Sequence, residues 1–153
     1  MGLKKVVYTA GTFDILNLGH VNIFKKSKKL GNYLIVGVST DKLVESYKHI
    51  KPIMPYKERF ALVGAIKYVD KVIKQTKLLD INILKKIRPD IITIGSDWQN
   101  KILEGLVWAK ENNIKIIYLP YTQQTSSSEI KKRIIKRSYE IIQSQCNRSK
   151  NVA

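Results

Sequence analysis

Five short apolar runs alternate with longer segments of helical character, and this alternation restricts the fold more than any other feature of the chain. Runs of strand length lie at residues 5–10, 33–39, 71–73, 90–94 and 115–119. Between them, residues 21–30, 55–66, 79–87 and 101–112 favour helices. The run at 90–94 is continuously apolar, which is typical of a buried parallel strand. The pattern predicts an α/β fold with a Rossmann-like, doubly wound, five-stranded and mainly parallel sheet.

The chain has the size of one domain. It has 153 residues, and no repeat or linker divides it, so we predict a single domain over residues 1–146 that includes a basic C-terminal helix. Residues 147–153 are expected to form a frayed tail. The single cysteine, Cys146, fits a reducing compartment, and no apolar stretch approaches the roughly 20 residues of a membrane span. We therefore expect a cytoplasmic protein.

The net charge of +16 points to an anionic partner, which could be a nucleotide, a phosphorylated metabolite, a nucleic acid or a membrane surface. Five of the basic residues lie close together at positions 131–137, in a segment where isoleucines recur at helical spacing: Ile130, Ile134, Ile135, Ile141 and Ile142. This segment is expected to be an amphipathic helix whose apolar face packs on the body or on a partner. We do not expect nucleic acid to be the primary partner.

Residues 45–55 contain two prolines and show no sustained periodicity, which predicts a loop. Pro55 suits the first turn of the following helix. Because long loops in compact domains are often functional, Lys48 and Lys51 are candidates to close over a bound phosphate.

Polar and glycine-containing segments follow three of the predicted strands. His20 lies just before a helical pattern, Asp97 and Trp98 follow the fourth strand, and Ser126, Ser127 and Ser128 precede the last helix. Loops at the carboxyl ends of parallel strands lie on one side of the sheet, so these residues can converge. Helix starts with free amides favour anions, and the predicted ligand is a phosphate.

The same segments resemble a known superfamily. Gly-Thr-Phe-Asp at residues 11–14 and Asn-Leu-Gly-His at 17–20 are similar to the signature of nucleotidyltransferases that include glycerol-3-phosphate, choline-phosphate and ethanolamine-phosphate cytidylyltransferases. Gly-Ser-Asp-Trp at 95–98 resembles the Gly-Asp-Asp-Trp of the glycerol-3-phosphate enzymes, and Thr-Ser-Ser-Ser at 125–128 takes the place of their Ile-Ser-Thr-Thr.

Two positions depart from that signature. Asn17 replaces the first histidine of the usual His-x-Gly-His, and Tyr121 replaces an arginine. An asparagine can donate a hydrogen bond to a phosphate oxygen but carries no charge. Heptose-phosphate adenylyltransferases, which residues 51–55 also resemble, do not depend on that arginine. The departures therefore leave the nucleotide open between CTP and ATP.

The resemblance implies a role for each matching residue. His20, Asn17, Lys48 and Lys51 are expected to be catalytic, and Arg59 and Lys67 to hold the substrate phosphate. The expected nucleotide-binding residues are Gly11, Thr12, Phe13, Asp14, Gly19, Asp97, Trp98, Ser126, Ser127 and Ser128. Mg²⁺ would arrive with the nucleoside triphosphate, without a metal site of the protein's own, and a homodimer is implied.

The reaction implied is attack of a phosphorylated small alcohol, such as glycerol 3-phosphate, on the α-phosphate of CTP, which releases pyrophosphate and forms a CDP-linked product. Two alternatives stay open. One is an adenylyltransferase that uses ATP and a sugar phosphate, and the other is an inactive nucleotide-binding homologue.

Overall fold

The structure is a computed structural model that describes residues 3–122 and 125–150. Its sheet contains β1 (Val6–Gly11), β2 (Tyr33–Ser39), β3 (Lys71–Gln75), β4 (Ile91–Gly95) and β5 (Lys115–Leu119). These strands lie in the order β3-β2-β1-β4-β5, and every neighbouring pair is parallel. The Rossmann-like, doubly wound sheet is thus confirmed, and the described sheet is wholly parallel. Its topological switch point lies between β1 and β4.

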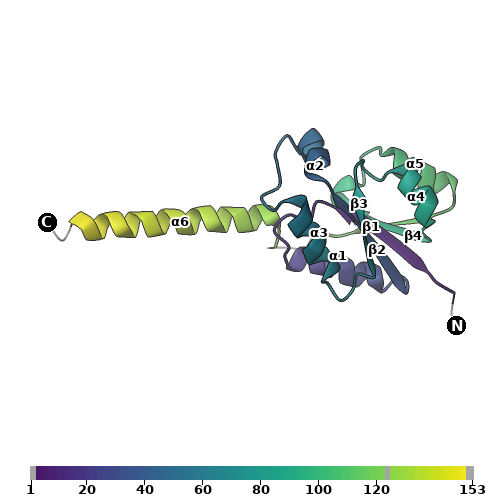
Figure 1. Cartoon of the computed structure of the whole chain (residues 1–153), viewed down its shortest axis with the longest axis horizontal. Coiled ribbons are helices and arrows are strands. Elements are labelled where there is room, and N and C mark those ends of the chain that lie inside the picture. Colours follow the sequence, from purple (N-terminus) through teal and green to yellow (C-terminus); the bar gives the residue numbers. More distant parts are fainter. Residues whose placement is uncertain (1–2, 123–124, 151–153) are drawn as a thin grey trace.

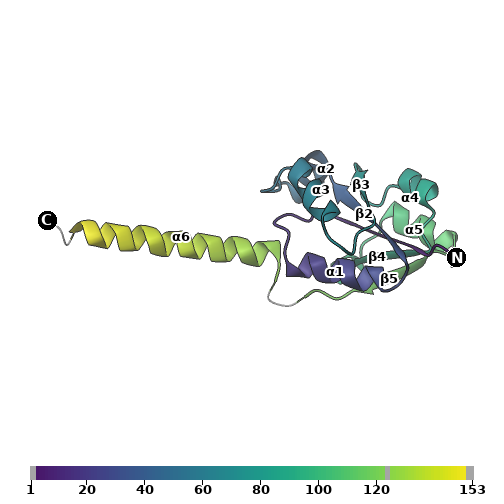
Figure 2. The same cartoon turned by 60° about the horizontal axis from the view of Figure 1, so that its bottom comes forward.

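Helices cover both faces of the sheet (Figure 1, Figure 2). On one face, α1 (Leu18–Lys28) and α3 (Tyr56–Gly64) share a core with Val7 of β1. On the other face, α4 (Ile81–Ile87) and α5 (Glu104–Glu111) share a core with Tyr8. Successive strand residues point to opposite faces, so this central strand is buried on both sides.

The structure differs from the sequence prediction at the start of α1 and at α2, which was not predicted. Helix α1 begins at Leu18 because Asn17 and His20 form a capping box at its start. The predicted loop at 45–55 is wrong for its first residues, since α2 (Asp41–Lys48) occupies them. Thr40 caps that helix, its apolar Leu43 and Val44 are buried, and the left-handed His49 ends it.

The last helix, α6 (Ser127–Lys150), projects away from the body (Figure 1, Figure 2). It extends to Lys150, past residue 147 where the frayed tail was predicted to begin, and the part of that tail at 151–153 lies outside the described residues. The apolar face expected to be covered is open, since Ile135 is 70% and Ile142 62% exposed. None of the described helices combines the length and apolarity that crossing a membrane requires.

Arg59 of α3 is a fully buried charge beneath the loop after β1. Its guanidinium donates to the carbonyl oxygens of Met54 and Thr12 and pairs with Asp41 at 2.6 Å. A buried charge is tolerated where its donors are satisfied, so these partners explain its position.

Replacement of Arg59 should therefore weaken the fold. We expect Arg59→Ala to lower the free energy of unfolding by about 3 kcal/mol, because Asp41 and two carbonyls lose their partner. Lys57→Ala, an exposed position of the same helix, should change it by no more than about 0.5 kcal/mol. Urea unfolding of both variants measures the difference, and equal stabilities would contradict the bracing role of Arg59.

Candidate functional site

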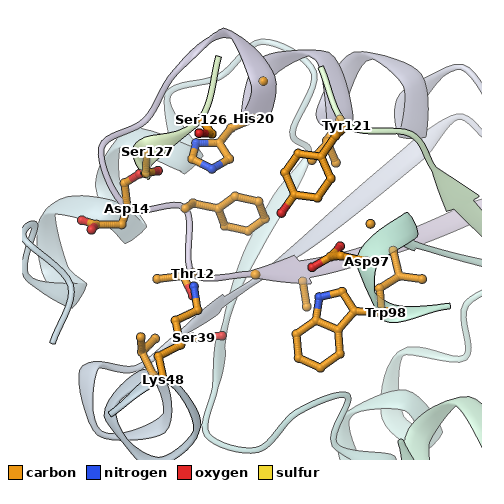
Figure 3. A pocket seen from close by; sticks show the side chains of 18 of the residues that line it. Thr12, Asp14, His20, Ser39, Lys48, Asp97, Trp98, Tyr121, Ser126 and Ser127 are labelled. Carbon is orange, nitrogen blue, oxygen red and sulfur yellow. The ribbon is translucent and has the colours of Figure 1, made fainter. Parts of the chain in front are cut away.

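A cavity of about 490 Å³ opens at the carboxyl ends of the strands (Figure 3). Its walls come from the carboxyl ends of all five strands, from the loops that follow them and from the start of α6. It spans the switch point between β1 and β4, where ligands bind in open α/β sheets. The three loops that were predicted to converge, after β1, β4 and β5, therefore do meet at this cavity.

His20 is held in one orientation and one tautomer. Its Nδ1 accepts the backbone N–H of Asn17 at 3.3 Å, and its ring packs edge-on against Phe13. A neutral imidazole that accepts at Nδ1 carries its proton on Nε2. Burial lowers the pKa of His20 from 6.5 to about 4, with Asp14 opposing this change and Lys48 adding to it. At neutral pH, His20 is thus an uncharged donor.

Asn17 uses its whole side-chain amide on the protein. Its Oδ1 accepts the N–H of Gly19 at 2.9 Å, while its Nδ2 donates to the carbonyl of Ile15 at 2.9 Å and to Ser127 Oγ at 3.4 Å. These contacts join the start of α1 to the start of α6. Although Asn17 lines the cavity, this geometry makes it a positioning residue.

Asp14 connects three segments that are far apart in the sequence. Its carboxylate accepts the N–H of Ile53 at 3.1 Å, that of Met54 at 2.9 Å and the ammonium of Lys131 at 2.9 Å. Burial by itself would raise the pKa of Asp14, but these three hydrogen bonds outweigh it and hold the pKa below its ordinary value. The carboxylate is therefore ionised and is held by three protein donors.

The three serines that were predicted to bind the nucleotide make different contacts. Ser126 Oγ accepts the N–H of Glu129 at 3.1 Å, as an N-cap does, and Ser127 Oγ donates to the carbonyl of Asp14. Ser128 lines the cavity with them. The start of α6 thereby points its unpaired amides and the positive end of its dipole at the cavity, which suits an anion.

Aromatic side chains form the opposite wall. Tyr47 Oη lies 3.0 Å from Thr12 Oγ1, and its ring meets Trp98 edge-on at 6.2 Å. Figure 3 shows Tyr121 and Trp98 on either side of Asp97. Partial burial, followed by the nearby Asp97 carboxylate, raises the pKa of Tyr121. This wall offers flat apolar faces and one carboxylate, which suit a heterocyclic base.

The predicted basic residues separate into two groups. Lys48 and Lys51 line the cavity, and partial burial lowers the pKa of Lys48. Arg59 lies beneath the first loop with its donors occupied, and exposed Lys67 is not among the lining residues. The positions of Arg59 and Lys67 do not support the predicted contact with a substrate phosphate.

The remaining predicted residues lie at the cavity. Gly11, Thr12, Phe13 and Gly19 all line it. Gly19 is required by close approach, because a Cβ there would lie 2.8 Å from the carbonyl oxygen of Thr125.

Among the lining residues that the sequence did not predict are Ser39, Tyr47 and Lys131. Ser39 Oγ is buried at the end of β2 and is the one buried side-chain polar atom without a hydrogen-bond partner among the residues described. Its position at a strand's carboxyl end could have identified it. Tyr47 was assigned to a loop, and Lys131 is one of many lysines on α6, so no sequence signal separated either from its neighbours.

Comparison with known proteins identifies the same region. Residues 8–133 match the family model described as cytidylyltransferase-like. The FAD synthase of Thermococcus sibiricus is 38% identical over 87% of this chain and 93% of its own length. The glycerol-3-phosphate cytidylyltransferase of Bacillus subtilis is 34% identical over 86% of this chain and 98% of its own length.

Two further similarities are of different kinds. The bifunctional protein HldE of Helicobacter pylori is 36% identical over 86% of this chain, which spans 28% of that longer protein. A crystal structure of a lipopolysaccharide core biosynthesis protein from Thermoplasma volcanium superposes with a TM-score of 0.63 at 31% identity, covering 78% of this chain and 97% of that one.

Gly19→Ala should damage the cavity without unfolding the sheet. The added Cβ would press on Thr125 and lie 3.0 Å from Asn17 Oδ1, so the starts of α1 and α6 must separate. We expect the affinity for nucleoside triphosphate, measured by calorimetry, to fall at least about tenfold. Gly64→Ala is the matched control, because its Cβ would meet only Val72 at an ordinary 3.5 Å. Equal affinities of the two variants would contradict the close packing.

His20 should titrate near pH 4 in the folded protein. The unfolded chain then binds more protons than the folded one between this pH and 6.5. The contribution of His20 to stability is therefore complete above pH 6.5 and is lost as the pH falls towards 4. NMR titration of its ring protons measures the pKa, and urea unfolding of His20→Gln over the same range should show a shallower pH dependence. A titration near 6.5 would contradict the buried orientation.

Proposed function

The chain belongs to the cytidylyltransferase-like family of nucleotidyltransferases, and on that premise we propose that it transfers a cytidylyl group from CTP to a phosphorylated small alcohol of the glycerol 3-phosphate kind. One observation carries the proposal. The Nε2 donor of His20 and the start of α6 lie side by side and face the same cavity (Figure 3). Such a site can bind the α-phosphate of a nucleoside triphosphate at His20 and the β- and γ-phosphates at the start of α6.

The proposed reaction needs no covalent intermediate. An oxygen of the acceptor phosphate forms a bond to the α-phosphorus, and the bond from that phosphorus to the oxygen bridging the β-phosphate breaks. Pyrophosphate leaves with that oxygen. Catalysis then depends on in-line positioning and on donors placed where negative charge develops.

Each part of the cavity has a proposed task. His20 donates from Nε2 to an α-phosphate oxygen as a neutral group, and the amides and hydroxyls at the start of α6 hold the β- and γ-phosphates. Lys48 and Lys51 supply positive charge from the segment after β2. Asn17 holds the two helix starts at the separation that the triphosphate requires.

Mg²⁺ fits this site as a companion of the nucleotide. Of the two acidic residues that line the cavity, Asp14 already accepts three hydrogen bonds, and Asp97 lies on the aromatic wall. No cluster of three acidic, histidine or cysteine ligands occurs within residues 3–122 and 125–150. The ion would be held by phosphate oxygens and water, and it would neutralise charge on the triphosphate.

A second candidate is adenylyl transfer from ATP, to a sugar phosphate or to FMN. Two observations favour it: Tyr121 stands where the cytidylyltransferases have an arginine, and the similar proteins include FAD synthase and HldE. The similarity to the glycerol-3-phosphate cytidylyltransferase, over 98% of that protein, and the Gly-Ser-Asp-Trp segment support CTP.

A screen of pyrophosphate release decides between these candidates. CTP and ATP are each combined with glycerol 3-phosphate, phosphocholine, phosphoethanolamine, sugar phosphates and FMN in the presence of Mg²⁺. We expect turnover with CTP and glycerol 3-phosphate or a close relative. Turnover only with ATP would replace the proposal by adenylyl transfer. Tight nucleotide binding without turnover in any combination would identify an inactive homologue.

His20→Ala should abolish turnover and leave the fold intact, because the cavity loses its donor to the α-phosphate. His49→Asn is the matched control: His49 is exposed, ends α2 in the left-handed conformation and tolerates asparagine there. Near-normal rates in His20→Ala would refute the role of His20.

A further inference from the structure

Helix α6 presents an apolar face that the rest of the described chain does not cover. Ile134, Ile135, Ile141 and Ile142 are each 46–70% exposed. Isolated helices gain little stability in water, and most of it comes from packing an amphipathic face. The body contacts only the first turns, through Ser127 and Lys131 (Figure 1, Figure 2).

The apolar pattern of α6 is symmetric about Ser138. Ile134 and Ile142 lie four residues before and after it, and Ile135 and Ile141 lie three before and after. Steps of three and four residues return to the same side of a helix, so the four isoleucines flank Ser138 on one face. Lys132, Lys136 and Glu140 fall on the opposite face.

We propose that α6 pairs antiparallel with the α6 of a second copy of this chain, about a twofold axis at Ser138. Twofold symmetry places Ile134 at the level of the partner's Ile142, and Ile135 at the level of the partner's Ile141. At each level one isoleucine from each helix enters the interface from opposite sides. The small Ser138 occupies the closest approach, where a large side chain would hold the helices apart.

The length of α6 fits this arrangement. Ser138 lies 11 residues after Ser127 and 12 before Lys150, so the axis divides the helix almost equally. Each helix therefore runs along the whole of the other and ends beside the partner's body. Three exposed apolar residues lie there, Leu18, Ile50 and Ile53, at 61–64% exposure. Asn17 and Asp14, which bond to the start of α6, place Leu18 and Ile53 at its root.

The pattern favours a second helix over a lipid surface. A bilayer would have to bury Ser138 and Lys131 in the middle of the apolar face, whereas a paired helix leaves the long Lys131 side chain with Asp14. The basic side chains on the far face stay in water in the pair. Since each copy carries a net charge of +16, salt should strengthen the association by screening repulsion.

Sedimentation velocity of the full chain at low and high salt tests the proposal. We expect a dimer that persists or tightens at high salt. Ile142→Lys should weaken the association at least about tenfold, because a charge replaces a buried isoleucine. Gln143→Lys adds the same charge at the next residue, on the opposite face, and should leave the dimer unchanged. Circular dichroism verifies that both variants stay folded.

Cysteine cross-linking tests the direction and register. In a Cys146→Ser background, Ile134→Cys and Ile142→Cys should form a disulfide with each other when mixed and oxidised, and neither should do so alone. Self-linked products would show parallel pairing and overturn the proposal. It is also overturned by a monomer at both salt concentrations, by a dimer insensitive to Ile142→Lys, or by a monomer that binds anionic vesicles through α6. None of these readouts needs turnover, so they are independent of the proposed activity.

Discussion

The arrangement of the cavity depends on the buried carboxylate of Asp14. It follows β1 and accepts hydrogen bonds from the segment after α2 and from Lys131 of α6, while its own carbonyl accepts from Ser127. Arg59 holds the same region from below, through the carbonyls of Thr12 and Met54. One buried anion and one buried cation thus clamp the loop after β1 to the segment at residues 53–54. Because all their partners are protein groups, the loop can adopt this geometry before a ligand binds.

The electrostatics of the site depend on burial and on the cations that line the cavity. His20 is partly buried and stays neutral, so the positive potential comes from Lys48, Lys51 and the start of α6. A donor that is fixed in place stabilises charge in a transition state without having to reorient. The capping box that starts α1 therefore also selects the nitrogen that His20 presents. The hydrogen bond that caps the helix therefore also determines that His20 carries its proton on Nε2.

Helix α6 links this site to the outside of the molecule. Its first turn lines the cavity and holds Asp14, whereas the following turns carry an apolar face away from the body. The family model ends at residue 133, so the four symmetric isoleucines lie beyond the segment that it matches. The two parts of α6 are thus under different constraints, the first from the cavity and the second from whatever covers the helix.

The sequence by itself determined the sheet, its parallel strands and the three loops that meet, because apolar periodicity and glycine positions depend on residues close together in the chain. It also identified His20, Asp97 and the serines, which lie where strands end. Only the tertiary structure shows which groups the side chains of Arg59, Asn17 and Lys131 bind. Each is a polar residue whose partners are distant in sequence, and a polar side chain can serve either a ligand or the protein. Which of the two it serves is decided by the donors and acceptors that folding brings within hydrogen-bonding distance, and residue order does not contain those distances.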